Sequence, residues 1–449
     1  MKKLLLISFS VIIFFVPGCE EEEEGKDSNI IFSISDNGYV YDDYYAVFLH
    51  DAANPTDLPI ATAILEQGGS AVFTKDSLAV DANDIEKLIV TTCTYNDADG
   101  TGNGIHFSCT SNWFVEKGAV WNMMGAANEL DGDGSDTVRV TIDAPGSMNF
   151  NKYYNDIGNN PISGTSPNIS SISHAHYVQA VDTEGKITIS SIVKMDDDNW
   201  YLGVLADREW APGIEFTIDE WQTGTINPLT VNITDTDDKD YFWLRSARYS
   251  ETYSPYDDLV NWETYFMYTL EPDTLGGSIT VNSTDGIPGA DKQRVICRWR
   301  QTDPNYISSY TDNLDYQAGE TMAPKDMSIS FDYSSATGTM LNIVADSDID
   351  QVRFSFILSD DDNSNNYYWV HYFDPNEGSR FDLPNIGDLN LTIDQVYNVF
   401  VQDYDNFDSS ADIVKALFED NNFYSSWTNR HYTYFGGLTD GLLGRQQVN

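Results

Sequence analysis

The sequence predicts a mainly β protein, built from two to three β-sandwich domains of immunoglobulin-like type in tandem, with one short helix near the C-terminal end. Short strand-like runs are separated by turns rich in Gly, Asn, Asp and Pro, which is the pattern of sandwich strands. Hydrophobic residues make up 41% of the 449 residues, enough to bury several cores in a chain of this length. The clearest runs are residues 45–49, 87–92, 137–142 and 352–357.

One helix is predicted near residues 410–420. Ser409 precedes it as an N-cap, and Asp412 stands three residues later, where a capping-box partner belongs. The apolar residues that follow recur at helical spacing and form one face, which we expect to lie against a sheet. They are Ile413, Val414, Leu417 and Phe418.

Two polar stretches without strand patterning are the predicted linkers, residues 158–170 and 302–325. They divide the chain into a first sandwich domain, an aromatic-rich β domain and a second sandwich domain that carries the helix. The predicted domains are residues 28–157, 158–301 and 302–449.

Three strand-like segments resemble one another, because each ends in Thr-Ile-Asp or Ile-Thr-Asp: residues 138–143, 229–235 and 389–394. Their spacings are unequal. The segments therefore indicate similar sandwich modules and not a solenoid of regular repeats.

The N-terminus has the order of an export signal. Two lysines are followed by the apolar run 4–16, then by Cys19 and five glutamates at 20–24. The run is shorter than the roughly 20 residues that a membrane-spanning helix needs, so we interpret it as a processed signal. The predicted signal peptide covers residues 1–18, and residues 19–27 form an acidic, solvated tether.

This order resembles the signal peptide and lipobox of a bacterial lipoprotein, and the glutamates resemble the tether of lipoproteins exported to the cell surface. The resemblance implies acyl chains on Cys19, an outer-membrane location exposed at the surface, and an outer-membrane protein as partner. The alternative is a secreted protein in which Cys19 joins a disulfide.

The chain is strongly acidic, with 24 Lys and Arg against 71 Asp and Glu and a formal net charge of −47. A field of that sign repels nucleic acid and anionic lipid surfaces and attracts cations such as calcium. Nucleic acid is therefore excluded as a predicted partner. Solubility in salty surroundings is the simpler reason for the charge.

Cys93 and Cys109 flank the turn-rich segment 96–104. If the flanking strands form a hairpin about residue 101, the two cysteines face each other at a distance that a disulfide spans. Export to an oxidising compartment favours that bond. Cys297 is left over, and we expect it to be buried in a strand.

The tip of this hairpin predicts a candidate calcium loop. Oxygen side chains alternate there, and Ca²⁺ takes several such ligands: Asp97, Asp99, Thr101 and Asn103. Position twelve from the first aspartate is a serine, so the loop is not an EF-hand. Two further acidic clusters are weaker candidates, and solvated turns are the simpler interpretation of both: Asp131, Asp133 and Asp136, then Asp346, Asp348 and Asp350.

Enzymatic signatures are missing, including His-Glu-x-x-His, Gly-x-Ser-x-Gly, the phosphate-binding Gly-x-x-x-x-Gly-Lys and Cys-x-x-Cys. Glycoside hydrolysis needs only two positioned carboxylates. Glu215 and Asp219 would share a strand face with Trp221, although a solvated sheet face is the simpler alternative. His174 and His176 would share a face in the same way, without a third metal ligand.

The aromatic residues predict a sugar platform in the middle domain. Sugar rings stack their C–H faces on exposed aromatic rings, and Trp210 lies in a loop without an obvious core to fill. The predicted platform comprises Trp210, Trp221, Trp262, Tyr253 and Tyr256. We expect three other tryptophans to fill cores: Trp243, Trp299 and Trp369.

The sequence as a whole predicts a surface-anchored lipoprotein that binds a glycan or another extracellular polymer without catalysis. Its layout resembles that of surface lipoproteins that assist polysaccharide capture, which string β-sandwich modules behind a lipid anchor. Two alternatives stay open: a secreted glycoside hydrolase, and a calcium-stiffened adhesin or structural surface protein.

Overall fold

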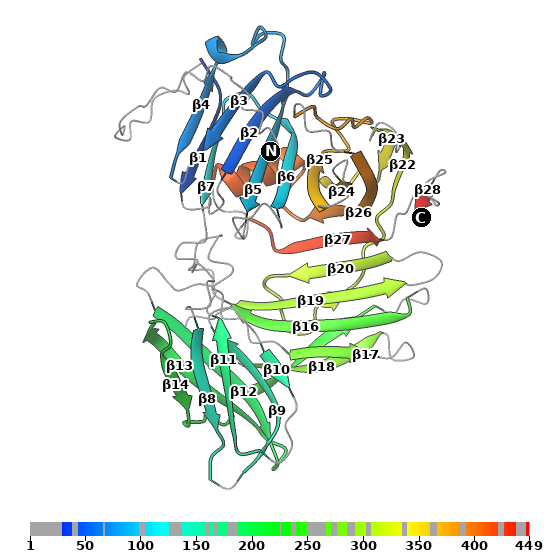
Figure 1. Ribbon diagram of the computed structural model, residues 1–449. Helices are drawn as coiled ribbons and strands as arrows, with labels where there is room; N and C mark the ends of the chain where they lie inside the picture. Colours follow the sequence, from blue (N-terminus) through cyan, green and yellow to red (C-terminus); the bar gives the residue numbers. More distant parts are fainter. Residues whose placement is uncertain are drawn as a thin grey trace.

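The computed structural model confirms the mainly β class, with strands β1–β28 and one helix, α1 (Figure 1). It describes residues 29–37, 44–65, 68–97, 105–124, 137–146, 148–157, 162–164, 169–177, 186–224, 226–234, 239–249, 266–270, 276–284, 292–301, 307–334, 339–359, 366–386, 392–420, 426–436 and 446–448. In these ranges no helix is long and apolar enough to cross a membrane.

The strands form four sandwich modules of seven consecutive strands each, which we call A to D. Module A comprises β1 (Ile30–Asn37), β2 (Tyr44–Asp51), β3 (Ala61–Leu65), β4 (Ser70–Thr74), β5 (Leu88–Asp97), β6 (Ile105–Val115) and β7 (Ala119–Met124), with the 3-10 turn η1 (Lys75–Ser77). Module B comprises β8 (Thr137–Asp143), β9 (Phe150–Ile157), β10 (Ile162–Gly164), β11 (Ser171–Tyr177), β12 (Lys186–Met195), β13 (Trp200–Glu209) and β14 (Glu215–Ile218).

Module C comprises β15 (Ile226–Ile233), β16 (Tyr241–Tyr249), β17 (Phe266–Leu270), β18 (Gly277–Thr284), β19 (Lys292–Gln301), β20 (Ile307–Asn313) and β21 (Thr321–Met322). Module D comprises β22 (Ile329–Ser334), β23 (Thr339–Ala345), β24 (Gln351–Ser359), β25 (Asn366–Phe373), β26 (Thr392–Tyr404), α1 (Ser410–Phe418), β27 (Asn429–Gly436) and β28 (Gln446–Val448).

Modules A, B and C share one strand order. The first, fourth and seventh strands form a three-stranded sheet, and the second, third, fifth and sixth strands pair in the order 3-2-5-6. Immunoglobulin sandwiches also have seven strands but divide them differently, as ABED and CFG. The predicted sandwiches are therefore present, but there are four of them within the described residues, and their strand order is not that of the immunoglobulin fold.

The four-stranded sets of modules A, D and C join edge to edge into one twelve-stranded sheet (Figure 1). β6 pairs with β25 in parallel, with Cys109 opposite Trp369, and β27 pairs with β20 antiparallel. Module B keeps two sheets of its own, at the lower left of Figure 1. The described residues thus form one three-module body and one sandwich whose sheets contain no strand of another module.

The hairpin of β5 and β6 belongs to two cores. Successive residues of a strand point to opposite faces. Leu88 and Val90 enter the core of module A, whereas Cys93, Cys109 and Trp113 enter the core of module D. The three-stranded sheets of A and D therefore cover opposite faces of the long sheet.

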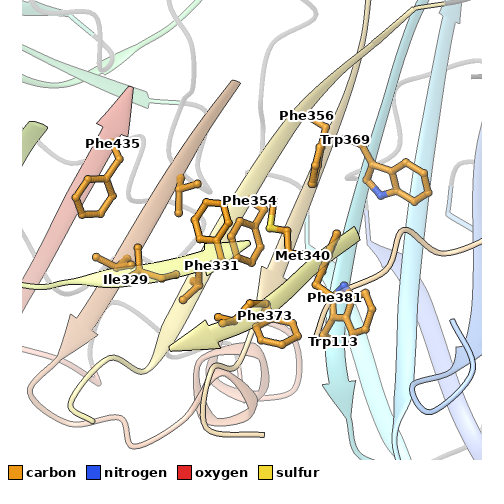
Figure 2. Close-up of a cluster of buried hydrophobic side chains, with 14 of the residues drawn as sticks. Trp113, Ile329, Phe331, Met340, Phe354, Phe356, Trp369, Phe373, Phe381 and Phe435 are labelled. Atoms are coloured by element: carbon orange, nitrogen blue, oxygen red, sulfur yellow. The ribbon is translucent and has the colours of Figure 1, made fainter. Parts of the chain in front are cut away.

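The core of module D is largely aromatic (Figure 2). Phe354, Phe356, Phe373 and Phe381 are fully buried, and Trp113 packs on Phe381 with ring centroids 4.9 Å apart. Burying such side chains stabilises a fold by about 1.5–3 kcal/mol each relative to exposure. Module D thus supplies much of the apolar burial that joins it to module A.

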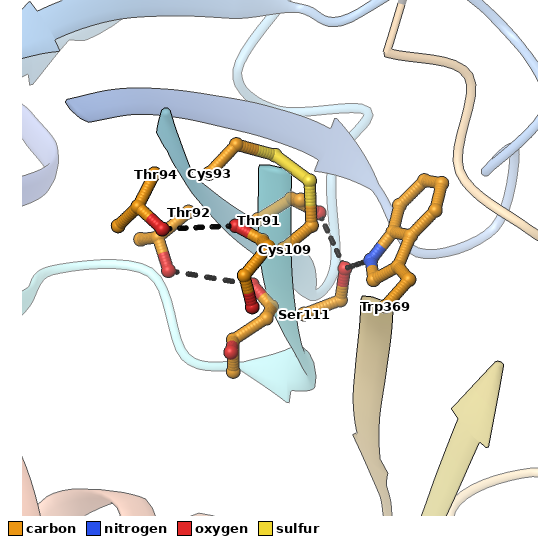
Figure 3. Close-up of a disulfide and its surroundings, with 9 residues drawn as sticks. Thr91, Thr92, Cys93, Thr94, Cys109, Ser111 and Trp369 are labelled. Carbon is orange, nitrogen blue, oxygen red and sulfur yellow. Dashed lines mark hydrogen bonds between the residues drawn. A yellow bond between two sulfur atoms is a disulfide. The ribbon is translucent and has the colours of Figure 1, made fainter. Parts of the chain in front are cut away.

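Cys93 and Cys109 form a disulfide across the hairpin, at directly opposed positions of β5 and β6 (Figure 3). Beside it, the Trp369 indole N–H donates a hydrogen bond of 2.8 Å to Ser111 Oγ, which also lies 2.7 Å from Thr91 Oγ1. The disulfide and this buried polar chain lie where module A meets module D. Cys297 is buried in β19, where burial raises the pKa of its thiol.

Helix α1 begins where the sequence predicts. The Ser409 side chain accepts a hydrogen bond of 3.2 Å from the Asp412 N–H. Val414 packs into the core of module A, and Phe418 stacks on Trp121 of β7 at 4.6 Å between centroids. The opposite side of the helix joins a small cluster at the end of β26: Leu314, Tyr404, Phe407, Ile413, Ala416 and Trp427.

The predicted domain boundaries do not coincide with the sheets. β9 lies before the boundary at 157/158 but pairs with β12 after it, and β19 and β20 pair across the boundary at 301/302. Both predicted linkers contain strands, among them β20, whose sequence Ile-Ser-Ser-Tyr-Thr-Asp-Asn lacks apolar alternation. Hydrophobic periodicity does not predict such a strand, because its buried residues are mostly polar.

The recurring Thr-Ile-Asp and Ile-Thr-Asp segments are equivalent in two cases out of three. Residues 138–143 fall in β8 and residues 229–235 overlap β15, the first strands of modules B and C. Residues 389–394 overlap the start of β26, which is not a first strand. The first strand of module D is β22, with Ile-Ser-Phe-Asp at 329–332.

We expect module B to unfold separately from the three-module body, because its sheets contain no strand of another module. Phe356→Ala should destabilise the three-module body by about 3–5 kcal/mol, and Ile189→Ala should destabilise module B by about 2–5 kcal/mol. Calorimetry of the two variants should show each moving a different transition. A single transition moved by both would contradict this modular arrangement.

Candidate functional site

Trp210 and Trp221 do not form an exposed platform. Both are half-buried and pack against the core of module B. The Trp221 indole N–H donates a hydrogen bond of 2.8 Å to the Asp143 carbonyl, and its ring lies over Gly203, where a Cβ would come within 3.2 Å of it. These tryptophans cover the edge of the sandwich, which a loop-like sequence pattern did not indicate.

Several predicted site residues lie outside the described residues. Asp97 ends β5, with Ile105 opposite it on β6, so the predicted calcium loop falls in the gap between the two strands. The residues outside the description are Cys19, Asp99, Thr101, Asn103, Asp131, Asp133, Asp136, Tyr253, Tyr256 and Trp262.

The acidic cluster at 346–350 is engaged with the protein. Asp346 accepts hydrogen bonds from the backbone N–H and hydroxyl of Ser328, and Asp348 pairs with Lys325 at 2.5 Å. Asp350 accepts a hydrogen bond of 2.7 Å from the Tyr404 N–H, and burial raises its pKa to about 7. The three carboxyls serve different partners, so they are not a shared calcium site. No group of three or more metal-binding side chains occurs within the described ranges.

The predicted carboxylate pair is not gathered on one strand. β14 ends at Ile218, so Asp219 and Trp221 follow it, and the exposed Glu215 pairs with Arg139 at 3.6 Å. The backbone of β11 pairs His174 with Val140 and His176 with Val138.

A different set of residues gathers on the twelve-stranded sheet. The apolar residues of β19 and β26, such as Trp299 and Val401, enter the cores of modules C and D. Their neighbours along the strands therefore share the opposite face. We call this half-buried set the arginine–aromatic face: Tyr241, Trp243, Arg298, Arg300, Tyr310, Arg353, Tyr372, Phe400, Tyr432 and Tyr434.

One row of this face crosses four strands. Trp243 on β16 lies opposite Arg298 on β19, which lies opposite Tyr310 on β20, which lies opposite Tyr432 on β27. The two tyrosine rings stack at 4.2 Å between centroids, and the Arg298 guanidinium lies 5.1 Å from the Tyr310 centroid. Trp243, expected in a core, meets Tyr310 edge-on at 6.2 Å.

A second row crosses seven strands, from Tyr241 on β16 through Arg300, Ser308, Tyr434, Phe400 and Arg353 to Tyr372 on β25. Strands are spaced about 4.8 Å apart, so this row is roughly 29 Å long. Arg300 lies 4.1 Å over the Tyr241 ring, and Phe400 packs on Tyr434 at 4.8 Å.

A buried ion cluster borders the face. Asp312 on β20 is fully buried and pairs with Arg294 at 2.8 Å and with Arg430 at 3.0 Å. Burial by itself raises the pKa of Asp312, but the two guanidiniums outweigh burial and hold that pKa below its usual value. Arg430 also lies over the rings of Trp427 and Tyr432, so the cluster fixes the border of the aromatic stack.

The side chains of this face have groups that could contact a ligand. Aromatic rings offer apolar faces to sugar C–H groups. Arginine guanidiniums that lie flat on rings keep a planar set of donors suited to carboxylates and phosphates. Because neighbouring strands hold these groups in fixed register, little conformational freedom remains to be lost on binding.

The sequence does contain one indication of this face, which is the placing of arginines at alternate positions of a predicted strand. Within residues 292–300, Arg294, Arg298 and Arg300 fall on one face of the strand, together with Ile296, and Val295, Cys297 and Trp299 fall on the other. Alternation predicts a cationic strand face. The aromatic residues of the face lie on β16, β20, β25, β26 and β27, and these strands are brought together only by long-range pairing.

Comparisons with known proteins do not identify a family. No protein-family model and no curated protein matches the chain. A Ca²⁺-stabilised, ice-binding adhesin of an Antarctic bacterium is 11% identical, with 84% of this chain and 94% of the other covered and a TM-score of 0.13. A putative adhesin from Bacteroides ovatus is 9% identical, with 67% and 88% covered and a TM-score of 0.13.

A third solved structure is SGBP-B of the Bacteroides ovatus mixed-linkage glucan utilization locus, in complex with a mixed-linkage heptasaccharide. It is 8% identical, with 93% of this chain and 97% of the other covered and a TM-score of 0.10. Superpositions with scores this low carry no argument about fold family or activity.

We expect Asp312→Ala to lower the free energy of unfolding by about 3–5 kcal/mol, because it leaves two guanidiniums beside an empty buried position. Asp315→Ala is the matched control, since its half-buried pair with Lys292 is more exposed than the Asp312 cluster and should contribute about 1 kcal/mol or less. Denaturant unfolding of both variants measures the difference. Equal losses of unfolding free energy in the two variants would show that the buried Asp312 cluster stabilises the fold no more than the Asp315–Lys292 pair does.

Proposed function

We propose that this protein is a cell-surface lipoprotein that binds a glycan or another extracellular polymer on the arginine–aromatic face, without catalysis. The observation that carries the proposal is the seven-strand row from Tyr241 to Tyr372, which consists of four aromatic rings, two guanidiniums and one serine. An extended polymer can follow such a row across the sheet.

The face suits a polymer better than a small molecule. It is a strip roughly 29 Å long by strand spacing, and its aromatic groups come from modules C and D of one sheet. Small-molecule sites are concave and enclose most of the ligand. A strip of half-buried rings offers many weak stacking contacts, which add up along a chain of sugars.

The proposal includes a lipid anchor at Cys19 and an outer-membrane location at the cell surface. The support is the order of the N-terminal residues: two lysines, an apolar run, a cysteine and an acidic tether. The described modules begin at residue 29, ten residues after Cys19. Such a tether would present the modules beyond the membrane surface, where an outer-membrane protein partner could meet them.

A calcium-stiffened structural protein is the second candidate, because three modules share one continuous sheet and form a stiff body. It predicts a rod that needs no ligand on the arginine–aromatic face.

We expect residues 28–449, in soluble form, to be retained on at least one immobilised polysaccharide and to release no products from it. Tyr432→Ala should weaken retention about two- to tenfold, because it removes one stacking ring, whereas Trp210→Ala should leave it unchanged. Released oligosaccharides would make the protein a hydrolase. Absence of retention on every polymer would favour the structural candidate.

We expect Cys19→Ala to move the full-length protein from the membrane fraction to the soluble fraction, because acyl chains on that cysteine are its proposed attachment. Cys297→Ala is the matched control, since that thiol is buried in β19 and should have no part in anchoring. Fractionation followed by immunoblotting measures the change. Membrane retention of Cys19→Ala would refute the anchor.

A further inference from the structure

We propose that the polymer bound by the arginine–aromatic face is an acidic polysaccharide, and that Arg353 makes the principal contact with its carboxylates. This inference rests on the proposed function, because it names the ligand class for the same face. The arginine concerned, Arg353, lies beside two aromatic rings.

Arg353 on β24 lies between two rings. Its cross-strand partners are Phe400 on β26 and Tyr372 on β25, and its guanidinium carbon lies 5.0 Å and 5.9 Å from their centroids. The Arg353 Nε is shielded from solvent and has no acceptor among the described residues. The half-buried side chain therefore lies beside two rings and has no anionic partner within those residues.

Two other half-buried arginines of this sheet are neutralised by a carboxylate. Arg294 and Arg430 share the Asp312 carboxylate. A cation that is partly removed from water costs free energy unless it finds an anion. Although the chain has 71 acidic residues, Arg353 has no carboxylate partner among the residues that the structure describes, and an incoming anion would supply one.

A second guanidinium lies in the same row. Arg300 on β19 is separated from Arg353 by β20, β27 and β26, so the two positions are about 19 Å apart by strand spacing. Phe400 and Tyr434 lie between them. A polymer with a carboxylate on each sugar can meet both guanidiniums while its rings stack on the aromatic pair between them.

The net negative charge of the chain favours polyanions of low charge density over those of high charge density. DNA carries one charge per about 1.7 Å of helix axis. A net charge of −47 opposes so dense a polyanion more strongly than it opposes a polymer with one carboxylate per sugar. Screening confines the attraction of Arg353 to about 8–10 Å at ordinary ionic strength. These conditions favour a weakly charged, sugar-based chain over nucleic acid or an anionic membrane.

The test uses three acidic polysaccharides and their methyl esters, which share a backbone and differ in charge: polygalacturonate, alginate and hyaluronate. The soluble form, residues 28–449, should bind the acid of at least one pair at least about tenfold more tightly than the ester, and Arg353→Gln should remove about that factor. Arg139→Gln is the matched control in module B, where the arginine is exposed and pairs with Glu215.

The ester comparison needs no variant, so it holds even if Arg353→Gln fails to fold, and Arg300→Gln gives a second point in the same row. Equal binding of acid and ester, or binding of neutral polysaccharides alone, would overturn the inference and leave the proposed function intact. Binding of nucleic acid or of phosphatidylglycerol vesicles instead of any polysaccharide would overturn both. So would an absence of binding to every polymer tested.

Discussion

The parallel pairing of β6 with β25 is the constraint on which the three-module body depends. It brings the Cys93–Cys109 hairpin of module A against the aromatic core of module D, so one hairpin is buried on both faces. The Trp369 indole and Ser111 satisfy each other inside that junction, where an unpaired polar group would cost about 1–3 kcal/mol. Without the junction, modules A and D would each expose an open sheet edge and an apolar surface.

The same pairing also determines which elements lie next to the arginine–aromatic face. Because modules A and D cover opposite faces of the sheet, helix α1 lies beside module A, near the end of β26. Beyond that helix the outer face of β24, β26, β27, β20, β19 and β16 carries rings and guanidiniums in register. Rings and guanidiniums from modules C and D therefore occupy one continuous sheet surface.

Local features of this fold were predictable from sequence, and long-range ones were not. The α1 cap at Ser409, the hairpin that places Cys93 opposite Cys109 and the buried Trp299 all follow from spacing over a few residues. The order of strands in the modules depends on pairings between distant segments, which no local pattern encodes. Trp243 illustrates the limit, because its strand was recognisable but the face it occupies depends on which neighbours β16 finds.

The join between β6 and β25 also bears on the order of folding. Trp369 and Ser111 are separated by 258 residues along the chain, and module B lies entirely within that interval. Contacts that close such long loops form slowly, because chain entropy is lost before they are made. The junction between β6 of module A and β25 therefore cannot form until the last third of the chain is present. Module B can form earlier, because its strands are neighbours in the sequence. Until that junction forms, the edge of β6 is open to pairing with other chains, so protection by a chaperone would matter most for this strand.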